Sequence, residues 1–385
     1  WILLYSEEKR RWQIAVRICF YLPNAYPLLE NSNRGGYGGA EVKLVFLAKA
    51  LYEHGYEIYF ITKEYVGLYN PEDKLWYRKG LKKYYKGKRF KFFTGLFTSW
   101  IAFSVVNSDI YLQRAAGSIT GLLALFCKLK RKMFCYMAAS SQDVDGSYIM
   151  NTNIRNKIFY KYGITHADTV FVQTKDFKEA LFHTHGINSF FIRDGHKIPT
   201  KIKSLKDRKF ITYIGGIRPV KRPEIFIKLA KHFPEKTFLM IGGSLTGEHY
   251  YQSVKQLADG EKNLIVKGHM KRDKIGHYLS QSLILVNTSD REGLPNTITE
   301  AWSFGVPVIG LNINPDNLLN GDLGFYCRGE FNLMVEYVNK VINNTAIYKM
   351  MSAKCVKYVT TYHDIEKISL EIDAVLKTQL AKYYG

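Results

Sequence analysis

The chain has 385 residues, of which 46% are hydrophobic and 23% are charged. Such a composition can fill a substantial core, so it excludes a chain that is mainly disordered, collagenous or coiled-coil. At about 150 residues per domain, the length predicts two or three domains. The 55 Lys and Arg residues outnumber the 34 Asp and Glu residues, giving a formal charge of +21. This excess favours an anionic partner, for which nucleic acid, nucleotide phosphates and an acidic membrane face are the candidates.

Short apolar runs alternate with longer helical patterns along the chain, which is typical of parallel βαβ units with both sheet faces covered. A polar, basic stretch at 193–209 interrupts the series, and we expect it to connect two doubly wound domains, 1–195 and 196–385. Ligands of such sheets bind beyond the carboxyl ends of the strands, so a cleft between two facing domains is the expected site. The predicted strands are 15–22, 57–62, 109–113, 132–138, 169–173, 189–192, 210–214, 237–241, 264–267, 283–286 and 306–310.

Basic and aromatic residues are interleaved between 78 and 103. A solvated surface loop, an anionic membrane surface and single-stranded nucleic acid each suit this mixture, and the neighbouring apolar residues favour the membrane. The longest charge-free stretch, 92–108, is shorter than the ~20 apolar residues needed to cross a bilayer, so no transmembrane helix is expected. We also expect no signal peptide.

Two further patterns concern the cysteines and the end of the chain. The five cysteines lie far apart and lack metal-ligand spacing, which favours a reducing, cytosolic compartment and no structural zinc. Between about 331 and 384 apolar residues recur at helical spacing, which predicts two or more amphipathic helices at the C-terminus.

The most informative segment is 288–310, which follows a predicted strand and opens a helix. Its Gly-Leu-Pro-Asn turn at 293–296 presents backbone N–H groups at the positive end of a helix dipole, where a diphosphate can bind. Glu300 lies two turns beyond Glu292 and can accept hydrogen bonds from sugar hydroxyls. A lone Glu in such a place is more often an ordinary capping residue, but the whole string favours a binding site.

This segment resembles the Glu-x7-Glu motif of the retaining family-4 glycosyltransferases, which have the GT-B fold, and the following residues resemble that family's A-x-x-x-G-x-P-V continuation. The resemblance covers nearly the whole chain. Residues 38–41 resemble the family's Gly-Gly-Ala-Glu loop, and 213–223 resemble the first strand and phosphate-binding turn of its second domain. The pairs at 242–243 and 268–269 fall where the family has its loops around the nucleotide base.

The resemblance implies an α/β GT-B fold, in which two Rossmann-like, doubly wound domains face each other across a cleft and helices follow at the C-terminus. The N-terminal domain would bind the acceptor, and the C-terminal domain would bind the nucleotide-sugar donor. The implied reaction retains the configuration at the anomeric carbon and uses no metal. The leaving diphosphate would help to take the proton of the acceptor, so no enzymatic nucleophile is required.

The resemblance also implies roles for individual residues. Lys221 would pair with the donor diphosphate and stabilise the departing nucleotide, with Arg218 as a second cation. Glu292 would contact the donor sugar, and Glu300 would hold the ribose hydroxyls. Glycines would let backbone N–H groups approach the phosphate. The other implied donor-binding residues are Gly38, Gly39, Gly216, Gly268, His269, Gly293, Leu294, Pro295 and Asn296.

Two positions depart from the family pattern: Gly216 stands where the family usually has Arg, and no His occurs at 140–142, where the family often has one near the sugar. The pair Asp143-x-Asp145 could hold a divalent cation. An Asp-x-Asp-Gly turn is common turn chemistry, however, so no metal site is predicted. His196, at the predicted domain junction, is expected to be a surface or core histidine.

These features predict a retaining hexosyltransferase that uses a UDP- or GDP-linked sugar and no separate cofactor. The expected acceptor is a glycan or lipid-linked glycan of surface polysaccharide or glycoconjugate synthesis. The expected location is cytoplasmic and peripheral, at the inner face of the membrane. Two alternatives stay open: a GT-B glucosyltransferase acting on modified DNA, which would use the positive charge, and a catalytically inactive GT-B scaffold, which the two departures suggest. The joint presence of Lys221, Glu292 and Glu300 favours an enzyme.

Overall fold

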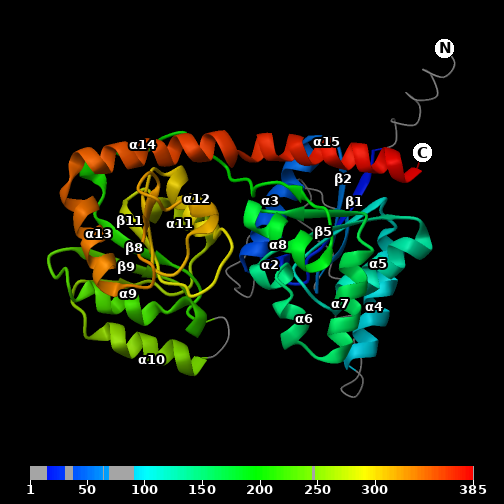
Figure 1. Ribbon diagram of the computed structural model, residues 1–385, viewed down its shortest axis with the longest axis horizontal. Coiled ribbons are helices and arrows are strands. Elements are labelled where there is room, and N and C mark those ends of the chain that lie inside the picture. The colour runs from blue at the N-terminus through cyan, green and yellow to red at the C-terminus, as the bar shows by residue number, and fades with distance from the viewer. Residues whose placement is uncertain (1–14, 31–37, 64, 69–90, 245–247, 385) are drawn as a thin grey trace, which may run out of the picture. The chain divides into compact units, whose positions relative to one another are not determined.

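Figure 1 shows the computed structural model, which describes residues 15–30, 38–63, 65–68, 91–244 and 248–384. Within these residues the chain forms two compact units. The first comprises the described residues up to Ile192 together with those from Ile368 onward, and the second comprises Arg193–Lys367. The predicted division after residue 195 lies close to the first of these limits. The prediction placed all the C-terminal helices in the second domain, whereas in the structure the residues from Ile368 onward belong to the first unit.

The first unit is built on a seven-stranded sheet in the order β3-β2-β1-β4-β5-β6-β7. Neighbouring strands are parallel except for β2 and β3. Ile18 and Phe20 of β1 pack into one core and Cys19 into another, because successive side chains of a strand point to opposite faces. The strands are β1 (Arg17–Tyr21), β2 (Glu57–Ile61), β3 (Val66–Leu68), β4 (Ile110–Arg114), β5 (Met133–Met137), β6 (Thr169–Val172) and β7 (Phe190–Phe191).

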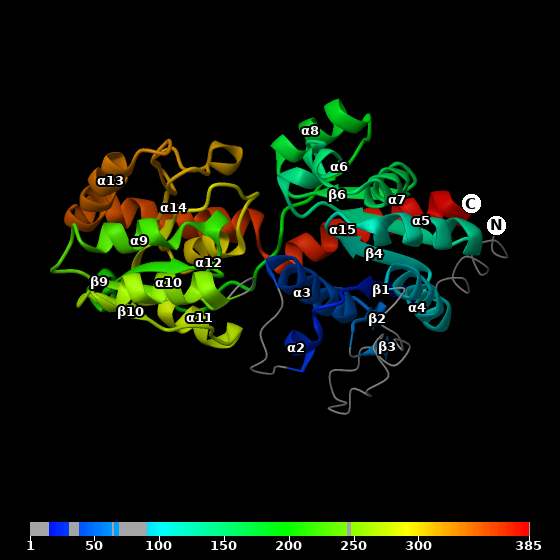
Figure 2. The same cartoon turned by 90° about the horizontal axis from the view of Figure 1, so that it is seen from below.

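Helices cover both faces of the first sheet. Side chains of α3 and α15 share the core of Ile18, whereas those of α4, α5, α7 and α8 share the core of Cys19. Helices α5 and α7 lie side by side (Figure 2), and a Cβ added to Gly163 would stand 2.4 Å from the carbonyl carbon of Thr120. The helices are α2 (Tyr26–Leu29), α3 (Gly39–Glu53), α4 (Lys91–Val106), α5 (Ser118–Lys130), α6 (Ser147–Asn151), α7 (Ile154–Thr165), α8 (Lys175–His185) and α15 (Ile365–Tyr384).

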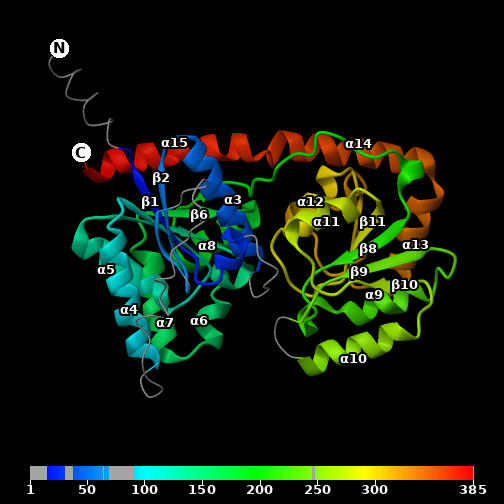
Figure 3. The same cartoon turned by 180° about the vertical axis from the view of Figure 1, so that it is seen from behind.

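The second unit contains a six-stranded sheet in the order β10-β9-β8-β11-β12-β13, all of it parallel. Its strands are β8 (Phe210–Ile214), β9 (Thr237–Ile241), β10 (Leu264–Val266), β11 (Ser282–Asn287), β12 (Val308–Gly310) and β13 (Gly324–Tyr326). Figure 3 shows α9 and α10 on one face of this sheet and α11 and α12 on the other. The helices are α9 (Pro223–Ala230), α10 (Glu248–Asp259), α11 (Arg272–Leu279), α12 (Asn296–Ser303), α13 (Phe331–Asn343) and α14 (Thr345–Tyr362).

The structure confirms the predicted α/β class, each predicted strand and the helical C-terminus. The sequence missed β3 and β13, which have three residues each and contain a glycine, so they lack a readable apolar run. The segment 78–103, predicted to contact a membrane, lies partly outside the described residues, and only its part from Lys91 is seen, in α4. Among the helices described, none combines the length and the apolar character needed to span a bilayer.

Candidate active site

Glycine loops meet at the carboxyl edge of the second sheet, because β8, β9 and β10 are adjacent and parallel. The amide of Gly215 donates to the carbonyl of Ile241 at 3.0 Å, and that of Gly242 donates to the carbonyl of Gly268 at 2.9 Å. A Cβ on Gly242 would stand 1.9 Å from the carbonyl oxygen of Gly215. Only glycine allows this approach. The three loops that the sequence singled out are therefore neighbours.

The other predicted residues of these loops lie close by. Gly216 follows Gly215 and is half-buried, whereas His269 is exposed. A Cβ on Gly243 would stand 2.8 Å from the Cβ of His269, so this glycine makes room for the histidine. Gly268 has φ +64, a left-handed conformation that glycine adopts without strain. The structure thus gives local reasons for glycine at 243 and 268.

Lys221 and Glu292 form an ion pair at this edge. The ammonium of Lys221 lies 2.5 Å from Oε2 of Glu292, with side chains that are 16% and 14% exposed. Lys221 ends a short 3-10 turn, Pro219–Lys221, and its carbonyl accepts a hydrogen bond from the hydroxyl of Thr288 at 2.6 Å. Lys221, the cation predicted for the diphosphate, and Glu292, the carboxylate predicted for the sugar, are therefore in contact although they lie far apart in the sequence.

Two residues at the end of β11, Asn287 and Ser289, complete the surroundings of Glu292, and the sequence analysis did not single them out. The amide of Asn287 donates to Oε1 of Glu292 at 3.2 Å, and the hydroxyl of Ser289 also donates to Oε1. The side-chain oxygen of Asn287 accepts from the amide of Ser289 at 3.0 Å. The carboxylate is thus fixed by hydrogen-bond donors on one side and a cation on the other. Their position directly after an apolar strand is the signal that could have found them.

The turn at 293–296 leads directly from Glu292 into α12. Pro295 precedes the helix, and the helix begins at Asn296. Leu294 and Asn296 are buried, while Gly293 and Pro295 are half-buried. A helix leaves the amides of its first turn without intrahelical acceptors, so its amino end attracts anions. The predicted strand-turn-helix arrangement is present, with the ion pair immediately before it.

Glu300 lies further along α12 and faces His196. Oε1 of Glu300 is 3.8 Å from Nδ1 of His196, and the hydroxyl of Thr299 lies 2.5 Å from Nε2 of the same ring. His196 is 3% exposed, and its amide donates to the carbonyl of His363 at 2.6 Å. His196 is therefore a core histidine, which was one of the two expectations for it. Its ring contacts Thr299 and Glu300 of α12.

Two polar groups near the ion pair complete this edge. The Nε atom of Arg218 is buried and makes no hydrogen bond to any residue that the structure describes. The hydroxyl of Tyr213 is likewise buried, and within the described chain it has no hydrogen-bond partner. Burial, followed by the charge of Glu292, raises the pKa of Tyr213, so this hydroxyl remains protonated. Arg218 lies directly before the turn of Lys221.

In the first unit, Gly38 and Gly39 lie at the start of α3. The amide of Gly38 donates to Oε2 of Glu41 at 2.9 Å, which forms a capping box with the helix. Asn24 also donates to Glu41, at 3.3 Å. The Gly-Gly-Ala-Glu loop thus has an evident structural role, and in this conformation the Gly38 amide is already engaged.

A cationic cluster lies at the carboxyl edge of the first sheet, and the sequence analysis did not identify it. Lys43 and Arg114 both donate to Oε1 of Gln173, at 3.0 and 2.9 Å. Each of the three side chains is less than a tenth exposed. The guanidinium of Arg114 also approaches the sulfur of Met137, at 3.1 Å. Helix α3, β4 and the residue after β6 each contribute one member, so only the tertiary structure assembles the cluster.

Asp143 is held within its own loop. Its carboxylate accepts from the amide of Ala139 at 2.6 Å, the hydroxyl of Ser140 at 3.1 Å and the amide of Ala116 at 3.4 Å. Burial raises the pKa of Asp143, although these donors act in the opposite direction. In the described part of the chain, no three His, Cys, Asp or Glu residues gather as metal ligands would. The geometry agrees with the turn interpretation of Asp143-x-Asp145.

Comparison with known proteins gives a family match within the second unit and a relative that spans most of the chain. Residues 195–359 match the family model described as glycosyl transferases group 1. A protein of Haemophilus influenzae named an uncharacterized glycosyltransferase is 24% identical over 363 residues, which cover 89% of this chain and 98% of the relative. These matches support a glycosyltransferase of the GT-B superfamily.

A second relative and a solved structure extend the comparison. A UDP-Gal:alpha-D-GlcNAc-diphosphoundecaprenol alpha-1,3-galactosyltransferase of Escherichia coli is 32% identical over 181 residues, covering 43% of this chain and 45% of that protein. The structure of sucrose-phosphate synthase from Thermosynechococcus elongatus is 14% identical, with a TM-score of 0.75 over 95% of this chain and all of that one. This likeness shows the GT-B fold. The glycosyltransferase family match contains Lys221, Glu292 and Glu300, whereas Gly38 and Gly39 lie outside it.

Proposed function

We propose that this glycosyltransferase moves a hexose, with retention of configuration, from a UDP- or GDP-linked donor to a hydroxyl of a glycan or lipid-linked glycan. The observation that carries the proposal is the Lys221–Glu292 pair, which lies at the carboxyl edge of a parallel sheet, immediately before the turn into α12. Such an edge is the usual ligand-binding place of a doubly wound sheet. A cation beside a helix amino end suits a diphosphate.

Each donor group has a proposed partner in the second unit. The diphosphate would take Lys221 as its counter-ion, with Arg218 as the second cation and the backbone of 293–296 as hydrogen-bond donors. Glu300 would accept from the ribose hydroxyls, and its Oε1 lies 3.8 Å from Nδ1 of the buried ring of His196. Glu292 would accept from the donor sugar. The glycine loops at 215–216, 242–243 and 268–269 would leave room for the base.

In the proposed reaction the bond between the anomeric carbon and the diphosphate oxygen breaks, and the acceptor oxygen forms its new bond on the same face of the sugar. The acceptor proton passes to the leaving diphosphate, so the step balances without an enzymatic nucleophile, a metal or a further cofactor. The Lys221 ammonium stabilises the charge that develops on the diphosphate. Gly38 and Gly39 would contact that phosphate, and for Gly38 this requires the hydrogen bond to Glu41 to open.

The proposed acceptor is lipid-linked. The Escherichia coli relative is named for transfer to a GlcNAc-diphosphoundecaprenol, and the formal charge of +21 suits an anionic acceptor at an anionic surface. Such an acceptor would place the enzyme at the inner face of the membrane, in surface polysaccharide synthesis.

Thermal unfolding with UDP, GDP, ADP, CMP and their common sugars tests the donor site. A ligand present at 100 times its dissociation constant stabilises the folded state by about 2.7 kcal/mol. We expect stabilisation by one nucleotide diphosphate and its loss in Lys221→Ala. Lys231→Ala is the matched control, because Lys231 pairs with Glu261 in the same unit with a side chain that is 58% exposed. If no nucleotide stabilises the folded chain, the proposal fails and an inactive scaffold is favoured.

A further inference from the structure

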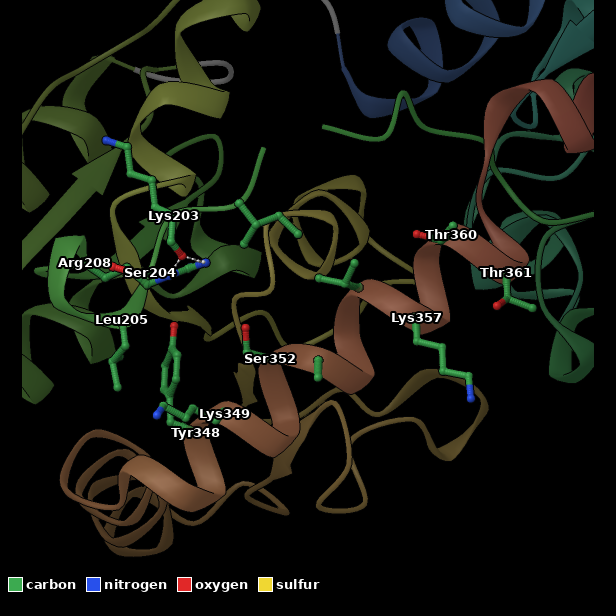
Figure 4. A pocket seen from close by; sticks show the side chains of 13 residues that line it. Lys203, Ser204, Leu205, Arg208, Tyr348, Lys349, Ser352, Lys357, Thr360 and Thr361 are labelled. Atoms are coloured by element: carbon green, nitrogen blue, oxygen red, sulfur yellow. Dashed lines mark hydrogen bonds between the residues drawn. The ribbon is translucent and has the colours of Figure 1, made fainter. Parts of the chain in front are cut away.

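A pocket lies within the second unit, between the segment 202–208 and α14 (Figure 4). Its volume is about 670 Å³, within the range of about 300–1,000 Å³ typical of small-molecule sites. None of the residues of the candidate active site lines it. The lining residues are Ile202, Lys203, Ser204, Leu205, Arg208, Tyr348, Lys349, Ser352, Ala353, Val356, Lys357, Thr360 and Thr361.

Hydroxyl groups supply polar contacts in this pocket. Tyr348 is 2% exposed, and burial raises its pKa, whereas Arg208, which its buried hydroxyl faces, has a smaller effect in the opposite direction. Figure 4 shows the hydroxyls of Tyr348 and Ser352 directed from α14 toward the segment that contains Ser204. Ser352 is half-buried, so its hydroxyl can donate to an acceptor oxygen of a ligand in the pocket.

Positive charge surrounds the pocket. Lys203, Lys349 and Lys357 are exposed, so their ammonium groups can reach a ligand at its mouth. The buried guanidinium of Arg208 donates to the carbonyls of Lys203, Ser282 and Phe304, which fixes the wall and leaves a positive charge beneath it. None of the described lining residues is acidic. Asp207 lies in the same turn, where it accepts from the hydroxyl of Ser204 at 2.6 Å.

The remaining wall is apolar. Leu205 and Val356 line the pocket, and Ile202 beside them is 40% exposed. An inorganic anion would gain nothing from these side chains, whereas an amphiphile would bury its first methylene groups against them. Cations, the hydroxyl of Ser352 and an apolar wall in one place therefore match a phosphate ester that carries a hydrocarbon chain.

We propose that this pocket binds the phosphate headgroup of an anionic phospholipid and so attaches the second unit to a membrane surface. The headgroup oxygens accept from Ser352, the lysines surround the phosphate, and the first acyl carbons lie on the aliphatic wall. This site is separate from the segment 78–103 and from the donor site. Its occupancy does not require glycosyl transfer, so its failure and that of the proposed function are distinguishable.

Co-sedimentation of the full chain with phosphatidylglycerol-phosphatidylcholine vesicles tests the proposal, with phosphatidylcholine vesicles for comparison. Each cation near an anionic surface contributes to partitioning, so Lys203→Ala and Lys349→Ala should each weaken binding about fivefold. Ala353→Trp fills the pocket without changing the charge and should weaken binding at least as much. The matched control is Lys354→Ala, since Lys354 lies on the same helix but pairs with Asp322 at 2.6 Å and does not line the pocket.

The outcomes separate the pocket from diffuse attraction. If Ala353→Trp binds as the wild type does while every lysine variant, including Lys354→Ala, binds equally weakly, surface charge alone is responsible and the proposal is overturned. If soluble glycerol 3-phosphate binds the pocket as tightly as the vesicles do and displaces them completely when in excess, the site takes a free anion, which also overturns the proposal. Unchanged unfolding temperature and nucleotide stabilisation in Ala353→Trp show that the unit is folded and its donor site is intact.

Discussion

Glu292→Gln separates the two roles assigned to the ion pair of Lys221. In the unliganded protein Glu292 is the counter-ion of Lys221, and in the proposed reaction it contacts the donor sugar while the diphosphate pairs with the lysine. The amide of Gln keeps the shape and can still accept from Asn287 and Ser289. With that oxygen retained, the NH2 group of Gln faces the Lys221 ammonium, so the substitution removes both the charge and the acceptor of the ion pair.

The magnitude follows from the geometry of the pair. Hydrogen bonds to charged groups contribute about 1.5–3 kcal/mol to stability, and side chains that are 16% and 14% exposed at 2.5 Å are little screened by solvent. A double-mutant cycle of Lys221→Ala and Glu292→Gln should therefore give a coupling in the free energy of unfolding of about 1.5–3 kcal/mol. The exposed pair Lys231–Glu261, treated in the same way, should give about 0.2–1 kcal/mol.

Nucleotide binding and turnover are then measured separately. A nucleoside diphosphate can replace the missing carboxylate as the partner of Lys221, so Glu292→Gln should bind the nucleotide at least as tightly as the wild type. Its turnover with the nucleotide-sugar should fall by about 100-fold or more, because a contact made to the reacting sugar is lost. Lys221→Ala should lose both binding and turnover.

Two results would refute this reasoning. A coupling near zero would mean that the pair does not form in solution. Equal loss of nucleotide binding in Glu292→Gln and Lys221→Ala would mean that the carboxylate is needed for the diphosphate itself, so that the two residues have one role and not two.

The remaining predictions concern stability. Gly163→Ala should lower the free energy of unfolding of the first unit by about 1–3 kcal/mol, since the new Cβ would stand 2.4 Å from the Thr120 backbone. Gly95→Ala, also within a helix and with nothing within 4 Å, should raise the free energy of unfolding by about 0.5–1 kcal/mol. Equal effects of the two substitutions in urea titrations would contradict the packing of α5 on α7. Burial raises the pKa of Asp143, so the folded state binds more protons than the unfolded state, and the contribution of this group to stability is lost as the pH rises through the interval above ~3.9. Asp143→Asn should lack that part of the pH dependence in urea titrations between pH 4 and 7, and identical slopes in both proteins would show that the group is not buried as described.

Local patterns in the sequence were sufficient for the strands and for the turn into α12. Apolar runs of five or so residues report burial on both faces of a sheet, and Gly293 to Asn296 carry the chemistry of a helix start, so these features depend on neighbouring residues alone. The glycines at 242 and 268 were singled out by the resemblance to a family, which matches short segments of the chain one at a time. Short edge strands such as β3 and β13 were missed because three residues with a glycine give no periodic signal.

Contacts between distant parts of the chain were decided only by the tertiary structure. The sequence named Lys221 and Glu292 as separate ligands, but the strand order brings the ends of β8 and β11 together, and so their side chains form one pair. The tertiary structure likewise brings His196 beside Glu300, and it brings Lys43 and Arg114 to Gln173, to which both donate hydrogen bonds. Periodicity shows which face of an element is buried, but not which element buries it. That choice depends on the packing of all the strands and helices at once, and it is why the helix beginning at Ile365 joins the core of the first unit from Ile368 onward.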